Sequence, residues 1–290
     1  MRILLLGPTG QLGADIAIAA ETAGATIIPC PRVALEMEDG AAIVRVLAES
    51  EADVVLNTTG YHKTDEVEDN APKAIAVNAH AVGILARACR DQGKRFATIS
   101  TDFVFGADRR VAPYAETDAP GPINVYGASK LMGESLARFH NPDCLIFRVA
   151  SLFGVKGPSG KGANFIEIML NQAREQDRLR VVRDRVMSPT YTADAARAII
   201  GALLMRASAG IYHCVGSGRA SWFELAREAI ELVGSGAIVV PVRSSEYRTR
   251  ATRPDYTVLD NAKLADIVGP IPDWRDAVRR YLIAKGHLSG

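Results

Sequence analysis

The residues best suited to chemistry are Tyr126 and Lys130, in the stretch 124–130 (NVYGASK). Residues four positions apart lie on one face of a helix, so both side chains can reach one site. A free phenol has a pKa of about 10, which is about 3 units above pH 7. Transfer of the phenol proton at pH 7 therefore costs about 4 kcal/mol. An ammonium about 4 Å away supplies about 4 kcal/mol at an effective dielectric constant near 20. The spacing therefore indicates a proton-transfer pair, although it is also common on solvent-exposed helices.

Hydroxyl groups stand at the end of a predicted strand, at Ser100 and Thr101. Ligands of doubly wound folds bind at the carboxyl ends of the strands, so a Ser or Thr there can donate a hydrogen bond to the oxygen that Tyr126 protonates. The preceding predicted strand ends in residues 57–61 (NTTGY). These small residues would let a ribose or nicotinamide approach the backbone.

A glycine-rich turn, residues 7–13 (GPTGQLG), separates the first predicted strand from an amphipathic helix. Glycine permits a tight turn and lets backbone N–H groups approach a pyrophosphate, whose charge then lies at the positive end of the helix. Glycines alone are a weak signal, but this position between strand and helix predicts a dinucleotide site rather than a plain turn.

The end of the second predicted strand indicates which dinucleotide is preferred. Folds that prefer NAD carry an acidic residue there, about 20 positions after the glycines, to hold the ribose 2′-hydroxyl. This chain instead runs from residues 26–29 into Cys30, Pro31 and Arg32, where the guanidinium could pair with a 2′-phosphate. We expect NADPH to be preferred; the alternative is a solvated Arg32 and an enzyme that also accepts NADH.

The elements that must position these residues alternate along the chain. Short apolar runs and helical segments follow one another, which is typical of a parallel sheet with crossover helices. We therefore expect an α/β fold: a Rossmann-type doubly wound parallel sheet with a smaller, intertwined α/β substrate domain. Residues 1–150 would bind the dinucleotide, and residues 151–290 would be mainly the substrate domain, with some segments returning to the first. The predicted strands are residues 3–6, 26–28, 54–56, 96–100 and 145–149, and the predicted helices between them are 11–23, 41–49, 72–92 and 126–139.

Composition excludes several classes of function. The 34 Lys and Arg residues almost balance the 33 Asp and Glu residues, which argues against a dedicated nucleic-acid or membrane binder. The apolar run at residues 1–7 is too short for a signal peptide, so we expect a cytoplasmic protein. The five histidines and four scattered cysteines lack metal-ligand spacing, and no metal is expected. The two tryptophans, Trp222 and Trp274, are expected to pack.

Several stretches together resemble the extended short-chain dehydrogenase/reductases, in the branch of dTDP-4-dehydrorhamnose reductases. The similarity spans most of the chain, and the branch implies reduction of the 4-keto group of a nucleotide-activated 6-deoxysugar by NAD(P)H. The similar stretches are 10–13 (GQLG), 76–79 (AVNA), 100–105 (STDFVF), 122–127 (PINVYG), 162–165 (GANF), Asp184 with 188–190 (SPT), and 253–254 (RP) with 258–260 (VLD).

The resemblance also implies roles for single residues. It makes Thr101, Tyr126 and Lys130 the catalytic residues, lets Lys130 hold the nicotinamide ribose, and places Asp102 at the sugar. We expect the substrate to contact Thr101, Asp102, Tyr126, Ser151, Asn164 and Arg253. We expect the cofactor to contact Gly7, Thr9, Gly10, Gln11, Leu12, Gly13, Arg32, Glu36, Met37, Thr59, Gly60, Tyr61, Tyr126 and Lys130.

Two residues depart from the pattern of the branch. Phe103 stands where an aromatic residue with a hydroxyl is usual. Ser151 stands where the rhamnose-forming enzymes carry a tryptophan, and a serine cannot supply the apolar wall of an indole. The general chemistry is untouched, but the identity of the sugar does not follow.

A basic cluster in the C-terminal half leaves two interpretations open. It is either a solvated face or a loop that grips the diphosphate of a nucleotide-sugar. Its members are Arg243, Arg248, Arg250 and Arg253.

The sequence thus predicts a reductase of a nucleotide-sugar, which could form a homodimer. Two alternatives stay open. One is a non-catalytic subunit that binds the cofactor or nucleotide-sugar and regulates a partner enzyme. The other is a nucleotide-sugar epimerase or dehydratase that retains NAD.

Overall fold

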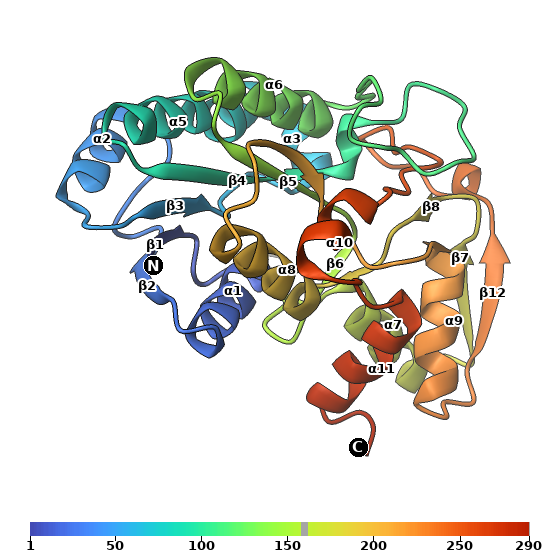
Figure 1. Cartoon of the computed structure of the whole chain (residues 1–290). Helices are drawn as coiled ribbons and strands as arrows, with labels where there is room; N and C mark the ends of the chain where they lie inside the picture. The colour runs from blue at the N-terminus through green and yellow to red at the C-terminus, as the bar shows by residue number, and fades with distance from the viewer. Residues whose placement is uncertain (158–161, 290) are drawn as a thin grey trace.

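The computed structural model describes residues 1–157 and 162–289, and its centre is a six-stranded parallel sheet with helices on both faces (Figure 1). The expected doubly wound α/β fold is confirmed. The strands of the sheet, in spatial order, are β10 (Gly210–His213), β5 (Leu145–Val149), β4 (Arg95–Thr101), β3 (Val54–Asn57), β1 (Arg2–Leu6) and β2 (Thr26–Cys30). The helical elements that accompany the first five of these strands in the chain are α1 (Gln11–Thr22), α2 (Gly40–Glu49), α3 (Thr64–Asp69), α4 (Ala71–Ile75), the π-helical turn η1 (Ala76–His80), α5 (Ala81–Asp91), the 3₁₀ turn η2 (Asp102–Val104) and α6 (Val125–His140).

Alternate residues of each strand face opposite layers of the sheet, and both layers are apolar. Leu5 and Phe147 face the layer that contains α1, whereas Leu4 and Ile146 face the layer that contains α2 and α5. Figure 1 shows α1 and α8 (Thr192–Leu204) on one side of the sheet and α2, α5 and α6 on the other. Burial on both faces explains why these strands are continuous apolar runs in the sequence.

The second half of the chain completes the sheet and also forms a second apolar core. Strand β10 pairs with β5 at the sheet edge, and α8 packs against α1. The other segments build a separate apolar core that includes Leu179, Leu225 and Trp274. These are β6 (Leu152–Phe153), α7 (Phe165–Glu175), β7 (Arg178–Val182), β8 (Val186–Met187), β9 (Thr190–Tyr191), β11 (Ala220–Ser221), α9 (Trp222–Leu232), β12 (Ile238–Val242) and α11 (Trp274–Ala284). The 3₁₀ turn η3 (Ser244–Glu246) follows β12. Helix α10 (Ala262–Val268) instead lies beside α8, and its Leu264 belongs to the core of the sheet.

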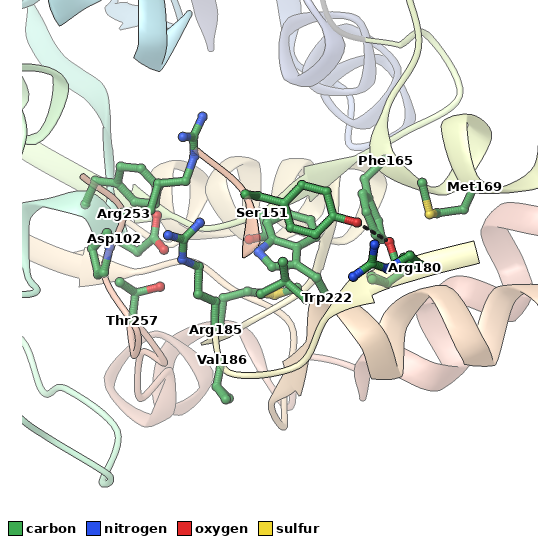
Figure 2. A pocket seen from close by; sticks show the side chains of 16 residues that line it. Asp102, Ser151, Phe165, Met169, Arg180, Arg185, Val186, Trp222, Arg253 and Thr257 are labelled. Atoms are coloured by element: carbon green, nitrogen blue, oxygen red, sulfur yellow. Dashed lines mark hydrogen bonds between the residues drawn. The ribbon is translucent and has the colours of Figure 1, made fainter. Parts of the chain in front are cut away.

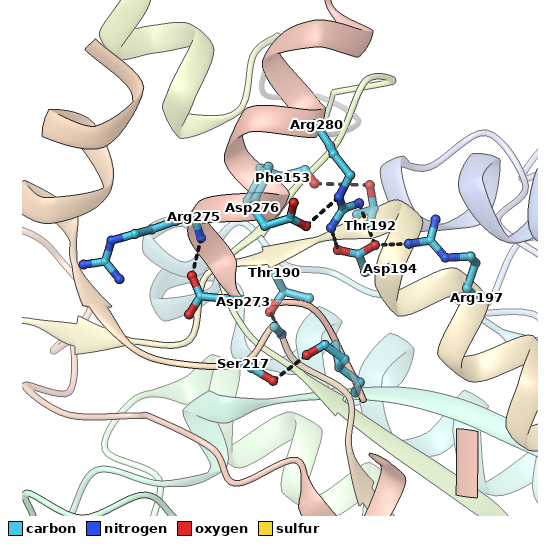
Figure 3. A network of polar contacts seen from close by, with 12 residues as sticks. Phe153, Thr190, Thr192, Asp194, Arg197, Ser217, Asp273, Arg275, Asp276 and Arg280 are labelled. Carbon is cyan, nitrogen blue, oxygen red and sulfur yellow. Dashed lines mark hydrogen bonds and ion pairs between the residues drawn. The ribbon is translucent and has the colours of Figure 1, made fainter. Parts of the chain in front are cut away.

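A polar network joins the two cores at the start of α8 (Figure 3). The carboxylate of Asp194 accepts bonds of 2.9 and 2.7 Å from Arg280 on α11, and it also pairs with Arg197. Thr192 bonds to Asp15 on α1 and, at 3.2 Å, to the carbonyl of Phe153. Because the Asp194 side chain is only 1% exposed, these arginines compensate a charge that water cannot reach.

The predicted helix over residues 72–92 is interrupted by η1, and the cause is Asn78. The Asn78 side chain accepts a bond from the Tyr61 N–H at 2.8 Å and donates to the Tyr61 carbonyl at 3.0 Å. It also donates to Ser129 on α6 at 3.0 Å. The wider turn therefore ties the loop after β3 to α6, and such turns are often found at functional sites.

A buried ion pair lies behind the carboxyl end of β4. Arg148 on β5 donates to both carboxylate oxygens of Glu134 on α6, at 2.9 and 2.7 Å, and the two side chains are only 2% and 3% exposed. Ser100 donates to the same carboxylate, and His213 on β10 lies 3.4 Å from the Arg148 guanidinium. Together these contacts fix α6 against three neighbouring strands.

In the part of the chain that the structure describes, no helix combines the length and the hydrophobicity that crossing a membrane requires.

Substitution of Arg148 by methionine should destabilise the protein strongly, because it leaves the Glu134 charge buried and uncompensated. We expect Arg148→Met to lower the free energy of unfolding by about 3–5 kcal/mol, measured by urea denaturation. The control is Arg2→Met, which breaks an exposed pair with Glu51 and should cost less than about 1 kcal/mol. Equal effects of the two substitutions would contradict the role of the buried pair.

Candidate functional site

A large cleft of about 1130 Å³ runs along the carboxyl edge of the sheet, above the point where β1 separates β2 from β3. Its far wall comes from the second core, through residues such as Phe165 and Trp222. This is the position at which doubly wound folds bind their ligands. Among the residues that line the cleft are the predicted cofactor contacts Gly7, Thr9, Gly10, Gln11, Leu12, Gly13, Arg32, Glu36, Met37, Thr59, Gly60, Tyr61, Tyr126 and Lys130.

The glycine turn joins β1 to α1 at one end of the cleft. A Cβ atom on Gly13 would lie 2.1 Å from the carbonyl oxygen of Gly7, so only glycine lets the helix approach the turn this closely. No side chain caps α1, and no acidic residue lies in its first turn. The Oε1 atom of Gln11 is buried without a hydrogen-bond partner. The open N–H groups of the helix fit the pyrophosphate end of a dinucleotide. The unused Gln11 oxygen is an acceptor and suits a ligand hydroxyl.

Arg32 lies on the same cleft, just beyond β2, but it has an acidic neighbour. Its Nε and Nη2 atoms donate to the two carboxylate oxygens of Glu36 at 3.0 and 3.2 Å. Both side chains are largely exposed. The pair leaves Nη1 and the outer face of the guanidinium available to a phosphate.

Tyr126 and Lys130 occupy the first turns of α6, which begins at an Asn124 cap. The Asn124 side-chain oxygen accepts a bond from the Gly127 N–H at 2.8 Å. A Cβ atom on Gly127 would lie 2.0 Å from the Phe103 carbonyl oxygen, so the helix lies directly against η2 at the end of β4. This contact brings Tyr126 to Thr101, whose hydroxyl lowers the pKa of the phenol.

Burial dominates the electrostatics of this group of residues. It raises the pKa of Tyr126 to about 12, against the lowering effect of the Thr101 hydrogen bond. Burial also lowers the pKa of Lys130 to about 8, while the Glu134 carboxylate opposes this shift. The Lys130 ammonium donates to the Ile99 carbonyl at 2.6 Å. The lowering of the Tyr126 pKa that was expected from Lys130 is not seen: burial has the largest effect on this pKa, and the neighbours that shift it are Thr101 and Asp102.

Asp102 stands at the junction of this cleft and a second cavity. Its Oδ1 accepts a bond from Thr101 at 3.1 Å, whereas its Oδ2 is buried without a partner. Burial raises the pKa of Asp102 to about 6, against the lowering effects of the Thr257 and Thr101 hydroxyls. An unused oxygen in this position is suited to a ligand hydroxyl.

The second cavity, of about 280 Å³, continues from Asp102 into the C-terminal half (Figure 2). Ser151 lines both spaces and has a φ of 41°, in the left-handed region that residues other than glycine rarely adopt. Phe165 and Trp222 also line both spaces, and their rings meet edge to face with centroids 4.7 Å apart. Apolar walls thus come from α7 and α9 rather than from residue 151.

The remaining predicted substrate contacts are partly engaged by the protein itself. Asn164 lines the cleft, but its side-chain nitrogen donates to the Gly154 carbonyl and the Tyr281 hydroxyl at 3.1 and 2.9 Å. Arg253 lines the second cavity and also pairs with Asp65 on α3 at 2.7 Å. The basic cluster does not act as one group, since Arg250 pairs with Asp69 and only Arg253 of its four members lines either space.

Sequence reasoning missed several residues of the site. Trp222 was expected only to pack, yet it lines both spaces, whereas Trp274 is buried in the second core. Asn78 and Arg185 received no role, although Asn78 lies in one of the family-like stretches. No local pattern marks Arg185, because its surroundings come from segments far apart in the chain.

The sequence and the fold of this chain are similar to those of known proteins. The model of the family described as "RmlD substrate binding domain" matches residues 1–285. A dTDP-4-dehydrorhamnose reductase of Mycolicibacterium smegmatis is 36% identical over 98% of this chain and 85% of its own length. The structure of such a reductase from Clostridium acetobutylicum has a TM-score of 0.91 at 31% identity, and covers 98% of this chain and 99% of its own. One from Bacillus anthracis, solved in complex with NADP, has a TM-score of 0.90 at 30% identity with the same coverage.

These matches extend over nearly the whole chain and agree with the resemblance that its motifs indicated. The chain belongs to the RmlD substrate binding domain family.

Proposed function

We propose that the protein is an NADPH-preferring reductase that converts the 4-keto group of a nucleotide-activated 6-deoxysugar to an alcohol. One observation carries the proposal: Thr101, Tyr126 and Lys130 line the same cleft as the glycine turn. The names of the relatives, dTDP-4-dehydrorhamnose reductases among them, support the substrate class. Residues 1–150 would bind the dinucleotide and residues 151–290 would mainly bind the sugar nucleotide.

The glycine turn and the N-terminus of α1 would hold the pyrophosphate, Arg32 the 2′-phosphate, and Lys130 the nicotinamide ribose. Gly60 lies close to Lys130, and a Cβ atom there would be 3.9 Å from the ammonium, so the loop after β3 leaves room beside the lysine. When bound, NADPH supplies the hydride that reduces the keto carbon.

Tyr126 would donate its proton to the oxygen of the developing alkoxide. A pKa of about 12 suits this task, because an alkoxide is much more basic than a phenolate and takes the proton readily. Thr101, which lines the same cleft, would orient the same oxygen. Lys130 would act by holding the nicotinamide ribose beside the phenol.

The substrate would extend from Tyr126 past Asp102 and Ser151 toward Asn164 and Arg253. Asp102 would accept a bond from a sugar hydroxyl through its unused oxygen. The proposal includes a cytoplasmic location and a homodimer; size-exclusion chromatography with light scattering tests the latter.

A panel of keto-sugar nucleotides, with NADPH oxidation as the readout, tests the reaction against its alternatives. A regulatory subunit would bind these compounds without consuming NADPH. An epimerase or dehydratase would retain NAD through purification and show no net consumption of NADPH.

Replacement of the phenol by phenylalanine should abolish proton donation and leave the cleft intact. We expect Tyr126→Phe to reduce kcat by at least about 10²-fold with NADPH affinity nearly unchanged, measured by steady-state kinetics and fluorescence titration. Normal turnover in this variant would rule out the proposed role.

The activity should depend on the charge of Lys130. Because burial lowers the pKa of this lysine to about 8, its ammonium is present below that pH and lost above it. We therefore expect kcat/KM to fall as the pH rises through about 8, while Tyr126, with a pKa of about 12, does not titrate in this range. A profile that stays level up to pH 9.5 would contradict this assignment.

Removal of the Arg32 charge should affect one coenzyme selectively. An ionic hydrogen bond is worth about 1.5–3 kcal/mol, so we expect Arg32→Gln to weaken NADPH binding by about tenfold or more. NADH, which lacks the 2′-phosphate, should bind with nearly unchanged affinity. Equal losses for both coenzymes in a fluorescence titration would show that Arg32 does not recognise the phosphate.

A further inference from the structure

Glu134 lies one helical turn beyond Lys130, and both side chains are buried. The two residues are four positions apart on α6, so they share a face of the helix. Lys130 is 6% exposed and Glu134 is 3% exposed. Lys130 lines the cleft, whereas Glu134 lines neither the cleft nor the second cavity. Glu134 can therefore act on the site only through a neighbouring residue.

Two adjacent residues of β4 hold these side chains in place. The Lys130 ammonium donates to the Ile99 carbonyl at 2.6 Å, and the Ser100 hydroxyl donates to the Glu134 carboxylate. Arg148 donates to both oxygens of the same carboxylate, at 2.9 and 2.7 Å. The carboxylate is thus fixed in one position, a single turn of helix from the lysine.

Other titratable or charged groups near this pair come from several elements. Burial raises the pKa of Tyr126 to about 12 and the pKa of Asp102 to about 6, and it lowers the pKa of His213 to about 4. These three pKa values lie outside the range around pH 8 in which Lys130 titrates. The groups near the pair are Tyr61 and His62 on the loop after β3, Asp102 on η2, Tyr126 on α6, Arg148 on β5 and His213 on β10.

Burial and Glu134 act on Lys130 in opposite directions. Burial disfavours the ammonium form, and the Glu134 carboxylate favours it. A buried ion pair is a poor source of stability compared with well-packed apolar side chains of similar size. An ammonium, however, donates stronger hydrogen bonds than a neutral amine does, because its donors carry charge. A carboxylate at this position is therefore suited to keep the lysine charged inside an apolar site.

We propose that Glu134 is a positioning residue of the active site: its carboxylate, fixed by Arg148 and Ser100, keeps the buried Lys130 in the ammonium form that holds the nicotinamide ribose. The inference rests on the proposed function and adds to it a residue that touches neither ligand. It also gives the buried ion pair a role besides stability. Without the carboxylate, the ammonium would lose its proton at a lower pH.

The test compares Glu134→Gln, which removes the charge, with Glu134→Asp, which keeps it. Both substitutions disturb the bonds to Arg148, so a purely structural role would affect both variants. The pKa of Lys130 would be measured in the full-length protein, without ligands, from the carbon and nitrogen NMR shifts of its side chain, which Lys130→Arg would assign. The pH profile of kcat/KM gives a second readout.

The loss of charge should lower the pKa of Lys130. Removal of a unit charge from about 6 Å shifts a pKa by about one unit or more at an effective dielectric constant near 20. We expect a fall of this size in Glu134→Gln, both in the NMR titration and in the pH at which kcat/KM declines. In Glu134→Asp both values should stay within a few tenths of a unit of those of the unchanged protein.

Asp194→Asn controls for the loss of a buried carboxylate elsewhere in the protein. Asp194 is 1% exposed and accepts two bonds from Arg280, but it lies where the two cores meet. We expect this substitution to lower the stability and to leave the pKa of Lys130 unchanged. If Glu134→Gln does not fold, the double substitution Glu134→Gln with Arg148→Gln removes both buried charges. The pKa of Lys130 should fall in that variant too.

Three results would overturn the inference: an unchanged Lys130 pKa in the variant without the carboxylate, an equal fall in Glu134→Asp, or an equal fall in Asp194→Asn. The NMR titration is separate from turnover. If no keto-sugar nucleotide is reduced but the pKa of Lys130 falls only where the carboxylate is lost, the reductase proposal fails and the effect of Glu134 on Lys130 stands. If NADPH is consumed and Lys130 titrates alike in all variants, the reductase proposal stands and this inference fails.

Discussion

The direct contact between helix α6 and the end of strand β4 is the constraint on which the site depends. No Cβ atom fits between residue 127 and the Phe103 carbonyl, so the backbone of the helix rests on the segment that follows the strand. Tyr126 and Thr101 meet for this reason, and the Arg148–Glu134 pair holds the next turns of the same helix. The positions of the reactive groups are therefore set by backbone packing and a buried charge pair, rather than by flexible loops.

The edge strand β10 was not predicted, but local patterns of the sequence were enough to predict the other five strands of the sheet, the glycine turn and the Tyr126/Lys130 pair. Each of these depends on neighbours a few residues apart: apolar runs give strands, glycines give the turn, and a spacing of four places two side chains on one helix face. The interrupted helix at Asn78 was not foreseen, because the interruption follows from bonds to Tyr61 and Ser129, distant in sequence. The same holds for Trp222 and Arg185, whose positions depend on how α7, α9 and the loop before β8 pack together.

Burial places opposing demands on the charged groups of the site. Burial lowers the pKa of Lys130, so that the lysine loses its charge more easily, and it raises the pKa of Tyr126, so that the phenol is a weaker acid. Burial also strengthens every electrostatic contact that a bound ligand makes. The unpartnered atoms Gln11 Oε1, Asp102 Oδ2 and Arg185 Nε lie along the two connected spaces. The free protein thus gives up stability at the places where ligands restore the missing bonds.

Strand β10 has a consequence for biosynthesis. It covers the edge of β5, but it is made more than sixty residues later, after the whole of α7 and α8. A nascent chain that already contains the first five strands therefore exposes an open β5 edge, with Phe147 and Arg148 beside it, until residue 213 has left the ribosome. Open edges of this kind pair readily with other chains, so translation of this segment is the interval in which aggregation competes most directly with folding.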